Sequence, residues 1–219
     1  MSVLNQPIIL AIDGPAGAGK STIARSLARR LGYTYIDTGA MYRAVGLWAL
    51  RLQIAPDDMI RLEQLARQAR IEFAAGRVSL NGEDVSEAIR EPEVSEMASR
   101  VAACPGVRRA MREEQRRIGM EGNAVIEGRD IGTVVFPEAR IKVFLDASEV
   151  ERARRRAAEL GSPVEQIAQA IASRDRRDRT RAEAPLAQAP DADYIDSSGL
   201  TPEQVEEAIL KLVRERTSN

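Results

Sequence analysis

The chain lacks histidine entirely and has a single cysteine, Cys104, among its 219 residues. Without an imidazole group, Ser-His-Asp and Cys-His nucleophilic catalysis are excluded, and so is a histidine general base. A lone cysteine forms no intramolecular disulfide, and the usual zinc-ligand spacings are missing. Cys104 stands in an apolar stretch without an activating partner nearby in sequence, which is typical of a core residue rather than a nucleophile.

Lysine, aromatic residues and long apolar runs are also scarce. Lysine occurs only at Lys20, Lys142 and Lys211, so arginine supplies most of the 32 basic residues. No apolar run reaches the roughly 18–20 residues of a membrane span, and no signal-peptide pattern is recognisable, so we expect a cytoplasmic protein without a membrane partner. A net charge of −1 and only 4% aromatic residues argue against a nucleic-acid-binding protein.

Apolar periodicity predicts short strands alternating with helices, the pattern of a parallel sheet covered on both faces. The expected strands are residues 8–12, 33–36, 124–127, 141–145 and 194–195. The expected helices are residues 21–31, 39–52, 57–70, 92–103, 105–119, 148–160, 163–173 and 202–216. Residues 71–85 alternate in hydrophobicity and contain Asn81-Gly82, a hairpin-type turn, so they predict a small inserted antiparallel sheet.

The segment from Gly14 to Ser21 reads GPAGAGKS and matches the phosphate-binding pattern G-x-x-x-x-G-K-[ST] in full. Glycines let backbone N–H groups surround the β- and γ-phosphates, and the positive end of the following helix faces the same oxygens. Lys20 adds a compact positive charge, and the Ser21 hydroxyl can ligate Mg²⁺. The expected ATP-binding residues are Gly14, Pro15, Ala16, Gly17, Ala18, Gly19, Lys20, Ser21 and Thr22.

The alternative to a phosphate site is a glycine-rich turn that only caps a helix, and eight matched positions between a strand and a helix argue against it. Asp13, directly before the loop, has either a structural role or a water-mediated contact with the metal. The Asn-Lys-x-Asp segment of GTPases and the signature segment of ABC-type ATPases are missing. Elimination therefore favours a small-molecule kinase, and a protein that uses ATP as a regulatory switch is the alternative from another class.

Two polar segments follow predicted strands, where ligands bind in open α/β sheets. In the first, residues 37–43, Arg43 is either a bidentate phosphate clamp or part of an ordinary helix start capped by Asp37 or Thr38. In the second, residues 128–133, an adjacent arginine and aspartate suit a polar acceptor that carries an anion and an amino group. The alternative there is a local Arg–Asp pair in a turn.

Five arginines occur in the eight residues from Arg174 to Arg181, interrupted by two aspartates. One reading is a solvated helix end whose charges pair with one another. The other is a mobile lid, hinged near Gly161, that brings arginines to the transferred phosphoryl group and excludes water. We favour the lid, because a chain without histidine and with few lysines must use arginines to neutralise this charge.

The succession of segments GPAGAGKST, DTGAMYR, ASRVAACPGVR, EGRDIGTVVFP, VFLDAS and RDRRDRTR…APL resembles the bacterial cytidylate (CMP) kinases over essentially the whole chain. The phosphate loop is generic, whereas DTGAMYR and GRDIGTVVFP are highly specific. The inserted sheet at residues 71–85 is also similar to the acceptor-binding region of that family. The resemblance implies Mg²⁺-dependent transfer of the γ-phosphoryl group of ATP to CMP and dCMP.

The resemblance also implies roles for individual residues. The residues around the cytosine and its sugar are Thr38, Tyr42, Ser99, Arg108 and Asp130. Those that hold the CMP phosphate are Arg43, Arg129 and Arg181, while Arg174 and Asp178 lie near the ribose and the lid. The expected catalytic residues are Lys20, Arg129, Arg174, Arg177 and Arg181. The assignment of Asp130 also agrees with chemistry, because a carboxylate accepts from the N4 amino group of cytosine.

The fold expected from these features is an α/β fold: three αβα layers, a central parallel sheet of about five strands, the antiparallel insert and a helical lid. We expect one domain over residues 1–219 and a monomer. Its parts are a core (1–60, 121–160 and 182–219), an acceptor-binding insert (61–120) and the lid (161–181). Glu127 stands where aspartate is common in the family, so its role near Mg²⁺ is open, and Thr38 replaces a common serine. The residues alone leave UMP, dTMP and non-nucleotide acids open as acceptors.

Overall fold

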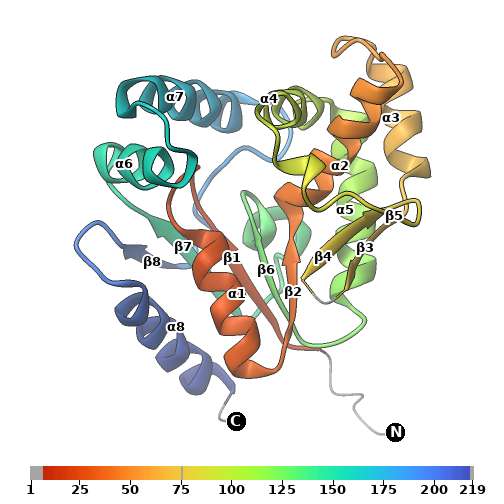
Figure 1. Ribbon diagram of the computed structural model, residues 1–219. Coiled ribbons are helices and arrows are strands. Elements are labelled where there is room, and N and C mark those ends of the chain that lie inside the picture. Colours follow the sequence, from red (N-terminus) through yellow and green to blue (C-terminus); the bar gives the residue numbers. More distant parts are fainter. Residues whose placement is uncertain (1–6, 75, 218–219) are drawn as a thin grey trace, which may run out of the picture. The chain divides into compact units, whose positions relative to one another are not determined.

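The computed structural model describes residues 7–74 and 76–217, and the ribbon is shown in Figure 1. The beginning of the chain, searched above for a signal peptide, and residue 75 of the insert lie outside the described residues. The described chain divides into two compact units. The first comprises residues 7–36, 118–180 and 184–217, and the second comprises residues 37–117 and 181–183.

The first unit is built on a five-stranded sheet in the order β2-β6-β1-β7-β8. The strands are β1 (Ile9–Asp13), β2 (Thr34–Asp37), β6 (Ala124–Gly128), β7 (Ile141–Asp146) and β8 (Asp193–Asp196). The central strand β1 runs parallel to β6 and to β7, and β7 runs parallel to β8. All residues of β1 and β6 are buried, as expected for central strands covered on both faces.

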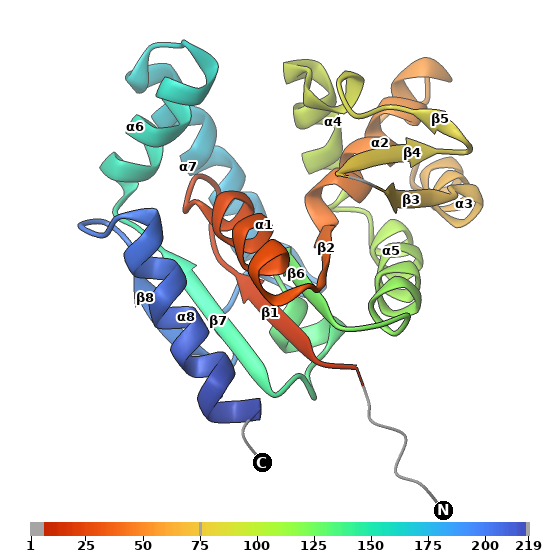
Figure 2. The same cartoon turned by 60° about the horizontal axis from the view of Figure 1, so that its bottom comes forward.

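Helices α1 (Lys20–Leu31) and α8 (Pro202–Thr217) lie side by side against this sheet, as Figure 2 shows. Each helix contributes an apolar stripe to one core cluster with the strands. Buried members of the cluster are Leu10 and Ile12 of β1, Leu27 of α1, Val143 of β7 and Ile209 of α8. Two further helices, α6 (Glu149–Leu160) and α7 (Val164–Thr180), pack against each other. Together with the parallel sheet, these helices confirm the predicted α/β fold.

The second unit contains the predicted antiparallel sheet, formed by β3 (Ile71–Ala74), β4 (Arg77–Leu80) and β5 (Glu83–Asp84). Asn81 and Gly82 both have positive φ, as the expected hairpin turn requires. The helices of this unit are α2 (Thr38–Arg51), α3 (Met59–Gln68), the 3₁₀ turn η1 (Ala88–Arg90), α4 (Pro92–Val101) and α5 (Pro105–Gly119), whose last two residues belong to the first unit. Helix α2 approaches α4 closely at Gly46, where a Cβ atom would lie 3.0 Å from the amide nitrogen of Ala98.

Two local features differ from the sequence expectation. The helix expected over residues 163–173 continues to Thr180, so the arginine run is helical except for Arg181. The prediction of its end was wrong because no glycine or proline interrupts the run, and Asp175 and Asp178 are buried in the folded chain. In addition, Ile131–Val135 form a π-helical turn, η2, which no periodicity indicated.

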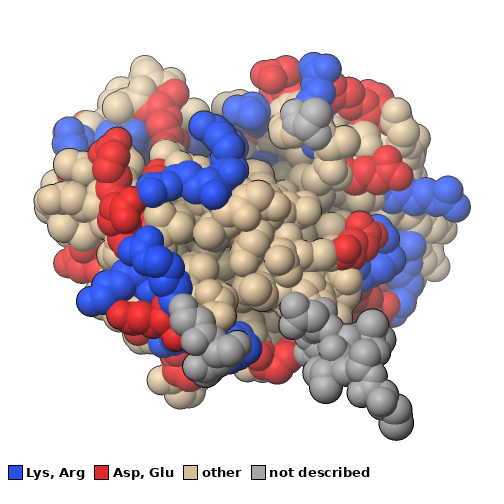
Figure 3. Space-filling model, turned by 90° about the horizontal axis from the view of Figure 1, so that it is seen from below, with Lys and Arg blue, Asp and Glu red and all other residues tan. Residues whose placement is uncertain are grey.

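Among the described residues, no helix is both long enough and apolar enough to cross a membrane. Basic and acidic side chains lie next to one another on the face shown in Figure 3, around an uncharged centre. Surface ion pairs of the first unit include the exposed pair of Arg30 with Glu207 and the half-buried pair of Arg216 with Asp193. Such mixing of signs agrees with the net charge of −1.

Candidate active site

The phosphate loop connects the end of β1 to the start of α1 and depends on glycine geometry. Gly14, Gly17 and Gly19 have φ values of 153°, 77° and 87°. A Cβ atom at Gly14 would lie 2.0 Å from the carbonyl oxygen of Leu145, so only glycine fits there. Gly19 is the N-cap of α1 and no side chain caps the helix, which leaves its first turn suited to bind an anion.

Lys20 is buried at the start of α1, with only 5% of its surface exposed. Its Nζ donates a hydrogen bond to the carbonyl oxygen of Pro15 at 2.6 Å. The pKa of Lys20 is lowered to about 7, mainly by burial and also by the neighbouring positive charges of Arg129 and Arg174, with Glu127 and Asp13 acting in the opposite direction. A bound anion would therefore stabilise the charged form of Lys20 strongly, and a phosphate group is such an anion.

Glu127 lies at the end of β6 and contacts two hydroxyl groups. Ser21 Oγ donates to Glu127 Oε2 at 3.0 Å, and the Tyr35 hydroxyl donates to Oε1. Only 4% of Glu127 is exposed. The Ser21 hydroxyl beside a carboxylate is a set of hard oxygen donors, and Mg²⁺ is usually bound by one or two such groups together with substrate phosphates. The residues present therefore fit Mg²⁺.

Asp13 accepts hydrogen bonds from the backbone N–H groups of Ile131 and Gly132, at 2.8 and 2.7 Å. Burial raises the pKa of Asp13 to about 6, although both hydrogen bonds act in the opposite direction. These bonds tie the turn after β6 to the end of β1, so they support the structural one of the two roles considered for Asp13. The same turn carries Arg129 and Asp130.

Arg129 connects this turn to helix α7. Its Nε donates to Oδ2 of Asp178 at 2.9 Å, and its Nη1 donates to the carbonyl oxygen of Gly128 at 3.2 Å. Burial alone would lower the pKa of Arg129, but the charge and hydrogen bond of Asp178 raise it above the ordinary value. Arg129 thus pairs with Asp178 of α7, and Asp130, its neighbour in the turn, is buried with 7% of its surface exposed.

The second unit brings together several residues that the sequence singled out. Asp37 is the N-cap of α2, accepting from the amide of Ala40 at 2.9 Å, and Arg43 Nη2 donates to Asp37 Oδ2 at 2.8 Å. Thr38 and Tyr42 lie one turn apart on α2, and the Arg108 guanidinium lies 5.6 Å from the centre of the Tyr42 ring. The segment after β2 therefore starts a capped helix, and the capping carboxylate also pairs with Arg43. The phosphate clamp by Arg43 stays a prediction.

Among the described residues, buried polar atoms of this unit without a hydrogen-bond partner include Ser99 Oγ on α4 and Arg43 Nε on α2. Buried polar atoms are normally satisfied, so such atoms are expected where a ligand binds. The expected site residues of this unit are Thr38, Tyr42, Arg43, Ser99, Arg108 and Arg181. The remaining ones, Lys20, Arg129, Asp130, Arg174, Arg177 and Asp178, belong to the first unit with the phosphate loop.

The sequence model of one protein family, described as cytidylate kinase, matches residues 10–215. The chain belongs to the cytidylate kinase family. A cytidylate kinase of Solibacter usitatus is 60% identical over 219 residues, which cover 97% of this chain and 94% of the relative. A cytidylate kinase of Geobacter sp. strain M21 is 50% identical over 226 residues, covering 99% of this chain and 97% of the relative.

A solved structure shares the fold of this chain. An uncharacterised protein from Eubacterium ventriosum superimposes with a TM-score of 0.53 at 13% identity, covering 95% of this chain and 99% of the other. At this identity the likeness concerns the fold alone. The specific segments DTGAMYR and GRDIGTVVFP, by contrast, stand at the start of α2 and in the turn after β6, where the family resemblance expected ligand-binding groups.

Sequence reasoning missed four residues that shape this site: Tyr35, Asp37 as the partner of Arg43, Arg152 and Asp175. Tyr35 reads only as part of an apolar strand. Asp175 was seen as an interruption of an arginine run, and Arg152 is one of four arginines in five residues of α6. Only the position of Asp37, before a predicted helix, carried a usable signal, because N-cap residues often pair with the following turn.

Proposed function

We propose that this chain transfers the γ-phosphoryl group of ATP to CMP and to dCMP, with release of ADP. The observation that carries the proposal is the buried Lys20 beside Glu127, Arg129 and Arg174 in a chain of the cytidylate kinase family. Three positive groups around one loop suit the charge that develops on a transferred phosphoryl group. The 60% identity to a cytidylate kinase over nearly the whole chain supports CMP as the acceptor.

For the donor, we assign the triphosphate to the N–H groups of the loop from Gly14 to Thr22 and to Lys20. Mg²⁺ would be held by the Ser21 hydroxyl, with Glu127 behind it. When bound, the ion neutralises charge on the β- and γ-phosphate oxygens. Tyr35 fixes one carboxylate oxygen of Glu127, so the other is directed at Ser21.

For the acceptor, we assign the phosphate of CMP to the arginines and the base to residues that can read its polar edge. The arginines are Arg43, Arg129 and Arg181. The residues assigned to the cytosine and its sugar are Thr38, Tyr42, Ser99, Arg108 and Asp130, with Arg174 and Asp178 near the ribose. A carboxylate at Asp130 accepts a hydrogen bond from the N4 amino group of cytosine, which uracil lacks.

The reaction needs no general base, because the attacking atom is a phosphate oxygen that already carries negative charge. This agrees with the absence of histidine from the chain. Catalysis then consists of holding the two phosphates in line and neutralising their charge. The groups available for this are Lys20, Arg129, Arg174, Arg177 and Arg181. Both substrates are free nucleotides, and we propose that the enzyme acts as a cytoplasmic monomer.

A coupled assay of ADP release tests the proposal. With ATP and Mg²⁺ but no acceptor, the wild-type chain is expected to release ADP slowly. Addition of CMP should raise the rate of ADP release at least about tenfold, to a rate on the order of enzymatic turnover. Lys20→Ala should abolish the stimulated rate, while Arg154→Ala on the exposed face of α6 should leave it unchanged. Tight ATP binding without any stimulation by CMP would instead identify an ATP-binding switch protein.

A further inference from the structure

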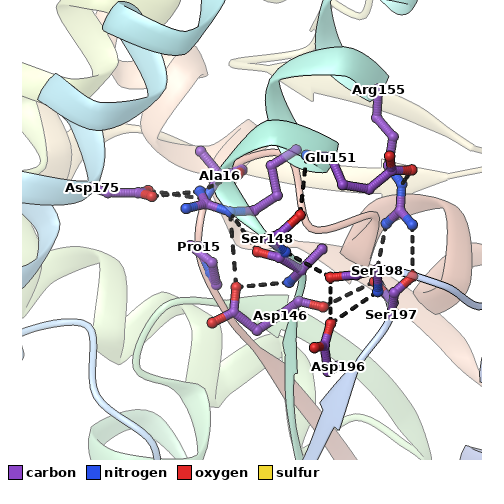
Figure 4. Close-up of polar contacts among 12 residues, drawn as sticks. Pro15, Ala16, Asp146, Ser148, Glu151, Arg155, Asp175, Asp196, Ser197 and Ser198 are labelled. Carbon is purple, nitrogen blue, oxygen red and sulfur yellow. Dashed lines mark hydrogen bonds and ion pairs between the residues drawn. The ribbon is translucent and has the colours of Figure 1, made fainter.

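The phosphate loop is held at Ala16 through both of its backbone polar groups. The amide N–H of Ala16 donates to Oδ1 of Asp175 at 3.1 Å, and its carbonyl oxygen accepts from Nη1 of Arg152 at 2.9 Å. The same Nη1 pairs with the other carboxylate oxygen of Asp175. Figure 4 shows Asp175 pointing toward Ala16. Ala16 of the loop, Arg152 of α6 and Asp175 of α7 are therefore all hydrogen-bonded to one another.

Both charged residues are fixed and almost completely buried, with 3% of Arg152 and 7% of Asp175 exposed. Arg152 Nε also donates to the carbonyl oxygen of Ala147 at 3.0 Å and lies 3.8 Å from Oδ1 of Asp146, at the end of β7. The guanidinium plane therefore has one orientation, set by the sheet. Burying such a pair brings little net stability compared with apolar residues of similar volume, so its presence calls for another role.

Apolar contacts seat the loop against the same two helices. The Ala16 side chain packs with Ala157 of α6 and with Ile167 and Ile171 of α7. At Gly17, a Cβ atom would lie 2.9 Å from the carbonyl oxygen of Arg152, so the loop and the first turns of α6 are in direct contact. Because close-packed contacts transmit displacement, a shift of α7 moves the loop.

The pair of Arg152 and Asp175, with its hydrogen bonds to Ala16, is called the clamp below. In sequence, Ala16 and Asp175 stand close to residues that the proposed function places in phosphoryl transfer. Ala16 follows Pro15, whose carbonyl oxygen accepts from Lys20. Asp175 directly follows Arg174, whose charge lowers the pKa of Lys20. Asp178, the partner of Arg129, lies three residues further along α7. A change at Asp175 therefore alters the alignment of Lys20 with Arg174 without removing either group.

We propose that Arg152 and Asp175 are positioning residues, which couple the phosphate loop to helix α7 and keep Lys20 and Arg174 aligned for phosphoryl transfer. The effect of this alignment on turnover rests on the proposed function. The coupling of the phosphate loop to helix α7 does not rest on it and can be measured separately. Misplacement of reacting groups by about 1 Å can cost 10²-fold in rate, so the effect on kcat is expected to be large.

The decisive variant replaces both charges by apolar groups of similar size, Arg152→Met together with Asp175→Leu. Such a double replacement of a buried pair often preserves or raises stability. We expect its Tm to stay at or above the wild-type value while kcat falls about 10–100-fold, with the KM for CMP unchanged. The matched control is Arg154→Met, whose arginine lies on the same helix in an exposed pair with Glu151. A double variant with wild-type kcat would overturn the proposal.

If the double variant does not fold, the single variant Asp175→Asn tests the proposal instead. It keeps an oxygen for the amide of Ala16 but loses the charge that pairs with Arg152, and it should also lower kcat with the KM for CMP unchanged. Hydrogen–deuterium exchange provides the readout that does not depend on activity. Residues 14–20 should exchange faster in either variant while β1 stays protected, and equal exchange in wild type and variant would refute the coupling. If the wild type shows no turnover of CMP, the proposed function fails and the exchange measurement alone decides on the clamp.

Discussion

The Nε of Arg129 lies 2.9 Å from Oδ2 of Asp178, which joins the turn after β6 to helix α7 by a partly buried ion pair. Asp178 keeps the pKa of Arg129 above its ordinary value despite burial, so the guanidinium stays charged throughout the working range of pH. The pair thereby holds a permanent positive charge close to Lys20, whose pKa it lowers. This arrangement suits a phosphoryl group that carries several negative oxygens.

Replacing Arg129 by alanine should therefore lower kcat/KM for CMP by about 10³-fold or more, the effect of arginines in related phosphoryl transfer. The affinity for ATP should change much less, because the loop and Lys20 remain. Steady-state kinetics with Arg156→Ala as the control, an exposed arginine paired with Glu159 on α6, would separate this loss from a general loss of positive charge. A decrease of less than tenfold would remove Arg129 from the catalytic set.

The contact of Glu127 with Ser21 predicts a change in the requirement for Mg²⁺. Glu127→Gln keeps the size of the side chain but removes its negative charge, and loss of a group that orients a metal ligand typically costs 10–100-fold in affinity. The Mg²⁺ concentration for half-maximal activity should rise by about tenfold or more, while Glu127→Asp should show a smaller rise. An unchanged Mg²⁺ titration in Glu127→Gln would show that the carboxylate only holds Tyr35 in place.

The lowered pKa of Lys20 predicts that ATP binding takes up a proton. In the nucleotide-free chain the ammonium loses its proton as the pH rises through about 7, and the phosphates of ATP restore it. At about pH 8.5 binding should take up about one proton, and the uptake should disappear near pH 6, where Lys20 is already charged. Above pH 7 the affinity for ATP should weaken by up to about tenfold per pH unit.

Calorimetry in two buffers that differ in ionisation enthalpy measures this proton uptake directly. Lys20→Arg is the control, because arginine stays protonated at both pH values and should show no uptake. Equal binding heats in both buffers at about pH 8.5 for the wild type would contradict a lowered pKa of Lys20.

Asp130 is predicted to determine which base is accepted. Asp130→Asn should lower kcat/KM for CMP by about 10–100-fold, the effect of losing a good contact with a base edge of about 1–3 kcal/mol, and should leave the KM for ATP nearly unchanged. The ratio of CMP to UMP turnover should fall with it. A variant with unchanged selectivity would show that Asp130 only stabilises the turn after β6.

Those parts of the fold that follow from local rules could be predicted from the sequence. The phosphate loop needs glycines at fixed positions, and β1, α1 and the hairpin at Asn81-Gly82 carry their periodicity within a few residues. The segments after β2 and β6 could be singled out because they follow strand ends. In these segments Thr38 and Asp130 are each less than 9% exposed, and their assignment to the acceptor stays a prediction.

The remaining features depend on contacts between residues far apart in the chain. Ala16 and Asp175 are 159 positions apart, and Ala16 and Arg152 are 136 apart, so no local pattern links them. The same holds for Tyr35 and Glu127, 92 positions apart. In a chain with so many arginines, a buried and fixed arginine looks the same in sequence as an exposed one, and only packing distinguishes them.

The most direct measurement of the central claim is a competition between acceptors in one reaction. The wild-type chain is given ATP in limiting amount with equal concentrations of CMP, UMP, AMP, GMP and dTMP, and the nucleoside diphosphates are separated by anion-exchange chromatography. The account predicts that CDP is the main new diphosphate, matched one to one by ADP derived from ATP. Predominant formation of another diphosphate, or consumption of ATP without transfer to any monophosphate, would contradict it.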